Sequence, residues 1–128
     1  MFSHVMVGAK DIDASKTFYD SVLGTIGVPA GQLDPKGRAW YRTKTGTFGI
    51  TKPIDGNDAC HANGGTIGFA CTDSDQVKAF HDAGVANGGK SIEEPPGWRQ
   101  GAAGRLYLAY LRDPSGNKIC AAYREPKA

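Results

Sequence analysis

Residues 4–24, HVMVGAKDIDASKTFYDSVLG, contain two patterns in succession. Val5 and Val7 alternate with larger or polar side chains, which predicts a strand with both valines on one face. Asp11 or Asp13 can then cap a helix, because a side-chain carboxylate accepts a hydrogen bond from a free N–H of the first helical turn. The stretch therefore predicts a strand followed by a helix.

The same unit recurs 62 positions further along the chain, in residues 66–86, TIGFACTDSDQVKAFHDAGVA. Asp11 recurs as Asp73 and Phe18 as Phe80, so the helix cap and the apolar helix face repeat together. Agreement at one residue would carry little weight, but the strand phase, the cap and the apolar face all agree. The sequence thus predicts a tandem repeat of one strand–helix unit.

Short β-like runs follow each predicted helix. They occupy residues 38–43, 47–52, 106–112 and 118–123, with a further short strand expected at 91–92. Residues 113–117, DPSGN, form a strong turn signal, because proline restricts φ while glycine and asparagine tolerate the left-handed region. Residues 53–64 are rich in turn-forming residues and are expected to link two halves. Each half is predicted to have the element order βαβββ.

One half alone has one helix and about four strands, which is too little to bury both faces of its sheet. We therefore expect a single α+β domain over residues 1–128, with one module at about 1–58 and the other at about 64–124. Two such modules side by side would form a curved, open barrel-like mixed sheet with the helices outside. The inner face of that sheet would enclose a cavity, which is the expected ligand site.

The composition is that of a globular protein, with 128 residues, 40% of them hydrophobic, and a formal net charge of +2. So small a charge gives no reason to expect nucleic acid or an anionic membrane as the partner. The chain lacks an apolar run of the length that a membrane span or a secretion signal needs. Cys60, Cys71 and Cys120 are an odd number with no close pair, which argues against a disulfide framework. We expect a reduced, cytoplasmic protein.

Several of these stretches together resemble the glyoxalase, bleomycin resistance and extradiol dioxygenase superfamily, also called the vicinal oxygen chelate (VOC) superfamily. The matching stretches are Phe2–Val5, Asp11 with Phe18–Asp20 and Leu23–Gly24, Gly65–Phe69, Val77–Gly89 and Asp113–Ile119. The resemblance covers nearly the whole chain, and its most specific part is the DPSGN turn after a strand. It implies paired βαβββ modules and an open cavity. The expectation of a homodimer rests on this resemblance alone.

In metal-using members of the superfamily, His, Gln or Glu side chains on the first and last strands of each module hold a divalent ion. The resemblance places these positions on His4, Thr66, Cys120 and a residue near Ile50 or Thr51. His4 alone has a suitable side chain, and a lone imidazole does not hold a catalytic ion. We therefore expect no cofactor and no tightly bound metal, since a divalent ion would have to bind with most of its ligand set missing.

Eight side chains are candidates for contact with a small-molecule ligand: His4, Trp40, Thr66, Trp98, Arg99, Arg105, Tyr107 and Cys120. His4 would lie on the strand face opposite Val5 and Val7, toward the cavity. Each candidate also has a plainer interpretation, such as a hydrogen-bonded histidine with no further role or, at Cys120, a buried and unreactive thiol.

Aromatic residues at two places are expected to shape the cavity. Either Trp40 or Tyr41 should face it, and the pattern leaves open which of the two does so. Residues 95–104 are predicted to form an irregular, Gly-rich loop that could carry Trp98 and Arg99 over a flat or anionic ligand. The alternative is a solvated loop with one tryptophan packed down.

These features lead us to expect a protein that binds a small, moderately polar or aromatic molecule in its sheet cavity. The alternative is a glyoxalase-type enzyme, either a lyase, an isomerase or a dioxygenase. In such an enzyme His4 would act as acid or base or would belong to an atypical metal site. A purely structural domain is a third interpretation, in which the inner sheet face would still need to be filled.

Overall fold

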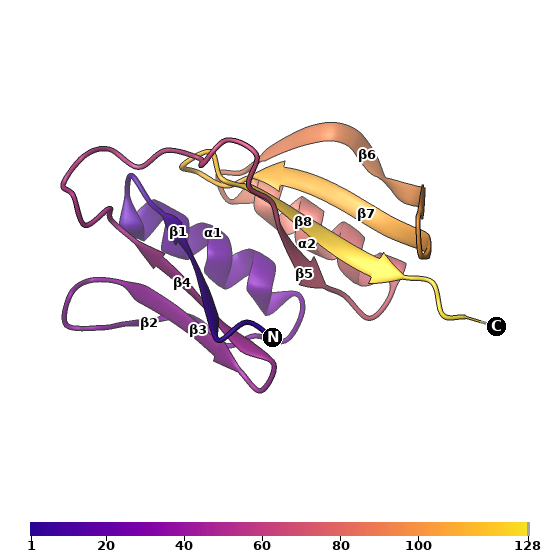
Figure 1. Cartoon of the computed structure of the whole chain (residues 1–128), viewed down its shortest axis with the longest axis horizontal. Helices are drawn as coiled ribbons and strands as arrows, with labels where there is room; N and C mark the ends of the chain where they lie inside the picture. The colour runs from indigo at the N-terminus through magenta and orange to yellow at the C-terminus, as the bar shows by residue number, and fades with distance from the viewer. Residues whose placement is uncertain (128) are drawn as a thin grey trace.

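The computed structural model describes residues 1–127 and contains two βαβββ modules in tandem (Figure 1). The first module consists of β1 (His4–Gly8), α1 (Ile12–Gly24), β2 (Gln32–Leu33), β3 (Ala39–Thr43) and β4 (Gly46–Thr51). The second consists of β5 (Ile67–Ala70), α2 (Ser74–Ala86), β6 (Lys90–Gly101), β7 (Gly104–Arg112) and β8 (Lys118–Arg124). The predicted α+β class and the tandem repeat are confirmed.

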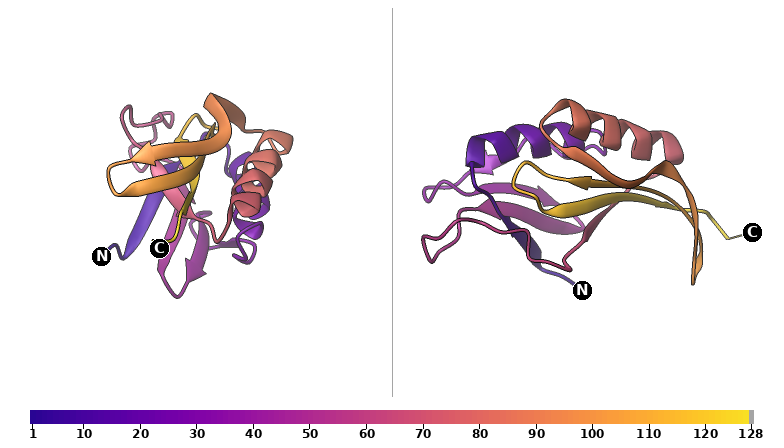
Figure 2. Two further views of the ribbon diagram at one scale, coloured as in Figure 1. Left: turned by 90° about the vertical axis from the view of Figure 1, so that its right-hand side faces the viewer. Right: turned by 90° about the horizontal axis from the view of Figure 1, so that it is seen from above.

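Each module forms one four-stranded mixed sheet, with the strand orders β1-β4-β3-β2 and β5-β8-β7-β6. The first strand of each module pairs in parallel with the last, and the other neighbours are antiparallel. Both helices lie next to each other on the same side of the sheets, and the arrangement stays open (Figure 2). The predicted open arrangement with outside helices is thus present, built from two sheets.

Equivalent aspartates begin the two helices. The Asp11 carboxylate accepts a hydrogen bond from the Ala14 N–H at 3.2 Å, and the Asp73 carboxylate accepts one from the Gln76 N–H at 2.7 Å. Such caps satisfy an N–H group that has no partner within the helix. Asp11 rather than Asp13 therefore caps α1. Neither of these helices is both long enough and apolar enough to cross a membrane, in the part of the chain that the structure describes.

A row of aromatic rings joins the two modules. The ring centroid of Phe48 in β4 lies 4.7 Å from that of Tyr19 in α1 and 5.3 Å from that of Phe69 in β5. Phe69 in turn lies 5.8 Å from Phe80 in α2. Because most of this aromatic surface is removed from water, its burial stabilises the contact between the modules as well as each module.

The DPSGN turn of the second module reaches into the first. Asp113 is 4% exposed and accepts hydrogen bonds from the Tyr19 hydroxyl at 2.7 Å and from the Asn117 amide at 2.8 Å. The same amide donates to the carbonyl of Gly8 at 2.8 Å. Burial, and then the Asp113 carboxylate, raise the pKa of Tyr19 well above its ordinary value, so the hydroxyl keeps its proton. The turn therefore connects β1 and α1 to the second sheet.

The structure corrects the prediction for residues 95–104. They form the end of β6 and its turn into β7 rather than an irregular loop. The pairing of β6 with β7 shifts between Ile92 and Gly97, which leaves two prolines in a bulge where no ladder hydrogen bond is needed. Glu93 lies in this bulge with a φ of 60°, a conformation that residues with a side chain seldom adopt. A proline pair in an edge strand thus has the sequence pattern of a loop.

Candidate functional site

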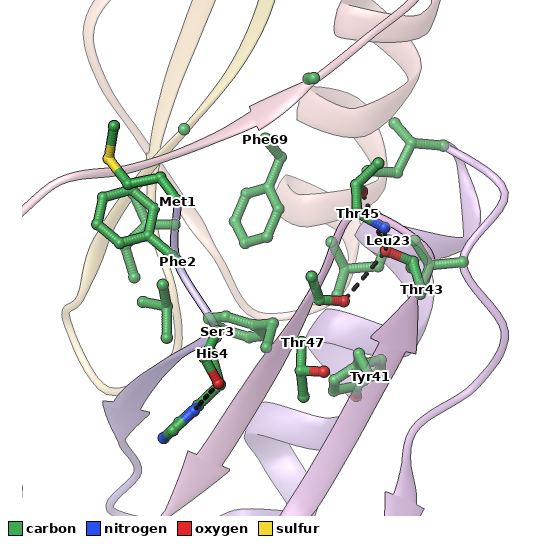
Figure 3. Close-up of a pocket in the computed structure, with 18 of the residues that line it drawn as sticks. Met1, Phe2, Ser3, His4, Leu23, Tyr41, Thr43, Thr45, Thr47 and Phe69 are labelled. Atoms are coloured by element: carbon green, nitrogen blue, oxygen red, sulfur yellow. Dashed lines mark hydrogen bonds between the residues drawn. The ribbon is translucent and has the colours of Figure 1, made fainter.

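A pocket of about 620 Å³ opens between the two modules (Figure 3). Its walls come from the start of β1, the end of α1, the β3–β4 hairpin and β5. Leu23, Phe48 and Phe69 supply apolar surface, and the exposed Phe2 lies at the edge. The volume is within the range of about 300–1,000 Å³ that is typical of small-molecule sites.

Strand alternation explains why this pocket is apolar. Phe48 in β4 and both Ile67 and Phe69 in β5 belong to the faces that pack toward the core. In the described structure β4 and β5 belong to different sheets, with no hydrogen-bonded ladder between them. The core-facing side chains at this junction therefore line a space instead of being covered by a neighbouring strand.

Tyr41 forms part of the pocket wall and is held there by its hydroxyl. The hydroxyl donates to the Asp20 carboxylate at 2.7 Å, and the Gly31 N–H donates to the same carboxylate at 2.9 Å. Burial, and then the bond to Asp20, raise the pKa of Tyr41 well above its ordinary value. Burial alone would raise the pKa of Asp20, but hydrogen bonds from Lys16, Gly31 and Tyr41 outweigh it and lower this pKa. Tyr41 therefore offers the pocket a ring surface and no proton acceptor.

Threonine hydroxyls of the β3–β4 hairpin are the main polar groups of the pocket. The Thr43 hydroxyl donates to the carbonyl of Gly46 at 3.1 Å and accepts from the Thr45 N–H at 3.2 Å. The hydroxyl of Thr47 makes no hydrogen bond to another described residue. A ligand with one or two neutral polar groups could therefore be oriented by this hairpin.

His4 is the one predicted ligand residue that lines the pocket. Its Nδ1 lies 2.9 Å from the Ser3 hydroxyl, and its ring points away from Phe69 (Figure 3). The ring lies on the sheet face opposite Val7, where its centroid is 6.4 Å from that of Trp40. His4 therefore belongs to the edge of the pocket and not to its centre.

Trp40 packs on the face of the first sheet that points away from the helices. Tyr41 is buried beneath the helices and, of these two residues, is the one that lines the pocket. Trp40 Nε1 donates to the Asp34 carboxylate at 3.0 Å. This hydrogen bond, together with those from Arg38, lowers the pKa of Asp34. The guanidinium carbons of Arg38 and Arg42 lie 5.5 and 5.2 Å from the Trp40 ring centroid. Trp40 is thus held by its neighbours outside the pocket.

Three other predicted residues come together on β6 and β7. The guanidinium of Arg105 lies 4.4 Å from the Trp98 ring centroid. The rings of Trp98 and Tyr107 meet edge to face with their centroids 5.3 Å apart. Arg105 also pairs with Glu125 at 3.2 Å. Trp98 is 40% exposed whereas Tyr107 is buried, and the cluster is separate from the pocket between the modules.

The last three predicted residues belong to three different segments: β6, β8 and the residue before β5. Arg99 donates to the carbonyls of Glu94 and Pro95 at 3.3 and 2.9 Å, which closes the bulge in β6. Thr66 precedes β5 and is exposed. Cys120 is buried, and burial raises the pKa of its thiol. A thiol that keeps its proton is a poor nucleophile and a poor metal ligand.

The positions at which the resemblance places metal ligands do not fit a divalent ion. His4, Thr66 and Cys120 offer one imidazole, one neutral hydroxyl and one buried thiol. Within residues 1–127, no group of three His, Cys, Asp or Glu side chains is placed to hold an ion. This donor set therefore supports no reaction step through a metal.

The sequence interpretation missed a contact between a nucleophile and a base on the surface of the second module. Ser91 Oγ lies 2.8 Å from His81 Nε2, and His81 Nδ1 lies 3.2 Å from the Asp82 carboxylate. The side chain of Asp82 is 81% exposed, whereas the acid of a serine-hydrolase triad is buried. Neither of the two pockets described for this chain includes these residues.

Comparisons with known proteins agree on one family. The family model described as Glyoxalase/Bleomycin resistance protein/Dioxygenase superfamily matches residues 1–121. The crystal structure of a glyoxalase/bleomycin resistance protein from Albidiferax ferrireducens T118 is 60% identical, with a TM-score of 0.94 over 97% of this chain and 99% of that chain. The lactoylglutathione lyase from Agrobacterium tumefaciens is 20% identical, with a TM-score of 0.66 over 96% and 92% of the two chains, and shares the fold. The search of curated proteins found no match.

Proposed function

Because the chain belongs to the glyoxalase/bleomycin resistance protein/dioxygenase superfamily, we propose that it binds a small, moderately polar or aromatic molecule between its modules. We propose further that binding needs no tightly held catalytic metal. The observation that carries the proposal is the pocket itself, about 620 Å³ in volume and lined mainly by apolar and aromatic side chains.

The lining favours a neutral ligand over a charged one. None of the described residues that line the pocket is Asp, Glu, Lys or Arg. An ion entering the pocket would lose its hydration without gaining an Asp, Glu, Lys or Arg side chain as a partner. An aromatic or aliphatic group would instead gain about 25 cal/mol for each Å² of apolar surface removed from water. The hairpin hydroxyls would then orient its polar substituent.

A pocket-filling variant tests this proposal. Gly46 lines the pocket, and a Cβ at this residue would meet no atom within 4 Å, so Gly46→Leu should fold and occupy part of the space. We expect a thermal-shift screen of neutral aromatic compounds to yield ligands that bind Gly46→Leu about tenfold more weakly than wild type. Gly24→Leu is the matched control, because Gly24 is equally open and lies outside the pocket lining. Equal affinities for wild type and Gly46→Leu would contradict the proposal.

Elemental analysis tests the part of the proposal that concerns metal. For protein purified without chelator or added metal, we expect well under one Zn, Fe, Mn or Ni per chain. Treatment with EDTA should leave the affinity for the screened ligand unchanged. If the protein held stoichiometric metal, and His4→Ala lost both the metal and ligand binding, His4 would be a metal ligand and the proposal would be contradicted.

An enzymatic role for His4 is the second candidate function, and the contact with Ser3 favours it. The Ser3 hydroxyl occupies Nδ1 at 2.9 Å, which leaves Nε2 available to a molecule at the pocket edge. His4→Gln separates the two functions. A binding protein would keep its ligand affinity, with no product formed by either form. An enzyme would convert the ligand in the wild type and lose turnover at unchanged affinity in the variant.

A further inference from the structure

A second pocket, of about 400 Å³, lies where the DPSGN turn meets Lys10, just after β1, and the start of β6. Its lining includes Lys10, Lys90 and Arg112, so both modules contribute cations to it. This pocket is lined by cationic side chains, whereas the described lining of the apolar pocket contains no Lys or Arg.

The three cations have no carboxylate to balance them. Within residues 1–127, no Asp or Glu oxygen lies within 4.0 Å of the charged nitrogens of Lys10, Lys90 or Arg112. Asp113 lines the pocket but is buried. It accepts hydrogen bonds from the Tyr19 hydroxyl and from three N–H groups of its own turn. The negative charge of Asp113 is therefore already stabilised by hydrogen bonds within the protein.

The cations also stand opposite one another across three strands. Lys90 in β6 pairs directly with Arg112 in β7, and Arg112 pairs directly with Lys118 in β8. Direct partners project from the same sheet face about 5 Å apart, where like charges destabilise the sheet. Glu93 pairs with Lys118 at one end of the row and leaves the other two unbalanced. Like charges on directly paired residues are unfavourable for the sheet, and unfavourable arrangements of this kind are expected at functional sites.

Contacts with the turn position the Arg112 side chain and the Lys10 backbone beside the pocket. Arg112 donates from Nη1 to the carbonyl of Gly116 at 2.9 Å, which keeps its guanidinium beside the turn. The Lys10 N–H donates to the Ser115 hydroxyl at 2.8 Å, which fixes the backbone of the first module at the same place. A guanidinium has five N–H donors, so Arg112 keeps donors for a ligand.

We propose that this pocket binds a phosphate group, either free phosphate or the phosphate of a small phosphorylated molecule. A phosphate carries up to two negative charges and several acceptor oxygens, which suit a guanidinium fork and two ammonium groups that approach from different elements. A neutral ligand would leave the row of cations unbalanced. The inference goes beyond the proposed function and does not depend on it.

Thermal unfolding of the full chain at fixed ionic strength tests the site. Sodium phosphate, glycerol phosphate or sodium acetate replaces part of the sodium chloride, and the two phosphates should raise the melting temperature where acetate does not. Lys90→Gln should raise the melting temperature in chloride alone, because it removes a like-charge pair, and should weaken phosphate binding about tenfold. Lys44→Gln removes an exposed lysine from the β3–β4 turn and should do neither.

The outcomes distinguish the source of the phosphate and can overturn the site. Stronger stabilisation by glycerol phosphate than by phosphate would identify a phosphorylated small molecule, and the reverse would identify the free ion; both support the site. Equal stabilisation by phosphate and chloride, or equal losses of affinity in Lys90→Gln and Lys44→Gln, would overturn it. If Lys90→Gln does not fold, Lys10→Gln repeats the test from the first module, where unchanged phosphate affinity would again overturn the proposal.

Discussion

At the scale of single residues, the apolar pocket depends on contacts that fix the position of Tyr41 in its wall. Asp20 accepts a hydrogen bond from the Tyr41 hydroxyl, and Gly31 makes room for the ring, because a Cβ there would lie 2.6 Å from a ring carbon. The sequence indicated that either Trp40 or Tyr41 would face the cavity. It did not indicate Asp20 or Gly31, since their roles follow from a contact between a helix and a strand that no local pattern describes.

Asp20→Asn should change how stability depends on pH. Partial burial opposes ionisation of Asp20, but hydrogen bonds from Lys16, Gly31 and Tyr41 outweigh it and lower the pKa from its ordinary value of 3.8. The folded state therefore favours the charged carboxylate. This stabilisation is present above pH 3.8 and is lost as the pH falls through the lower, folded value. Urea unfolding should show a steeper loss of stability at acid pH in wild type than in the variant. Parallel curves would contradict the assignment.

At the scale of elements, the local patterns predicted both helices and the strands β1, β3, β4, β5, β7 and β8. In each of these strands, the alternation of apolar and polar residues and the turn residues that bound it lie within a few positions of one another. The sequence did not locate β2, whose two residues are strand because they pair with Trp40 and Ala39. Of β6 it predicted only residues 91–92, because two prolines lie in a bulge further along the strand. Pairing with a neighbouring strand, which a single segment does not reveal, decides both cases.

The cap of α1 yields a prediction at this scale. Asp11→Ala should lower the free energy of unfolding by about 1 kcal/mol, because the Ala14 N–H would lose its partner. Asp13→Ala, inside the first turn, is the control and should cost clearly less, since its carboxylate acts only through the helix dipole. Denaturant unfolding of the two variants measures the difference. The reverse order would show that α1 begins at Asp13.

At the scale of the whole molecule, the repeat predicted two modules with an open arrangement, and the structure has both. The sequence predicted a cavity on the inner face of one curved sheet and did not predict a pocket at the junction of two separate sheets. That space depends on how the two sheets are set against each other, which follows from contacts between modules such as Phe48 with Phe69 and Tyr19 with Asp113. Trp98, Arg105 and Tyr107, which were predicted to contact the ligand, lie together at a different place.

Separating the modules should therefore abolish folding of the first. A fragment of residues 1–58 keeps Tyr19 and Phe48 but loses Phe69 and Phe80, so its aromatic face would be exposed to water. We expect no cooperative thermal transition for the fragment and a single cooperative transition for the full chain. A cooperative transition in the fragment would show that the first module has a sufficient core of its own.

The hydrogen bond from Asn117 to Gly8 spans 109 positions of the chain, and this has a consequence for synthesis. A ribosome adds Asn117 to the chain 109 positions after Gly8, so β1 lacks this hydrogen bond while the residues between them are being made. During that interval the nascent polypeptide carries bare aromatic surface, which makes it a natural client for chaperones.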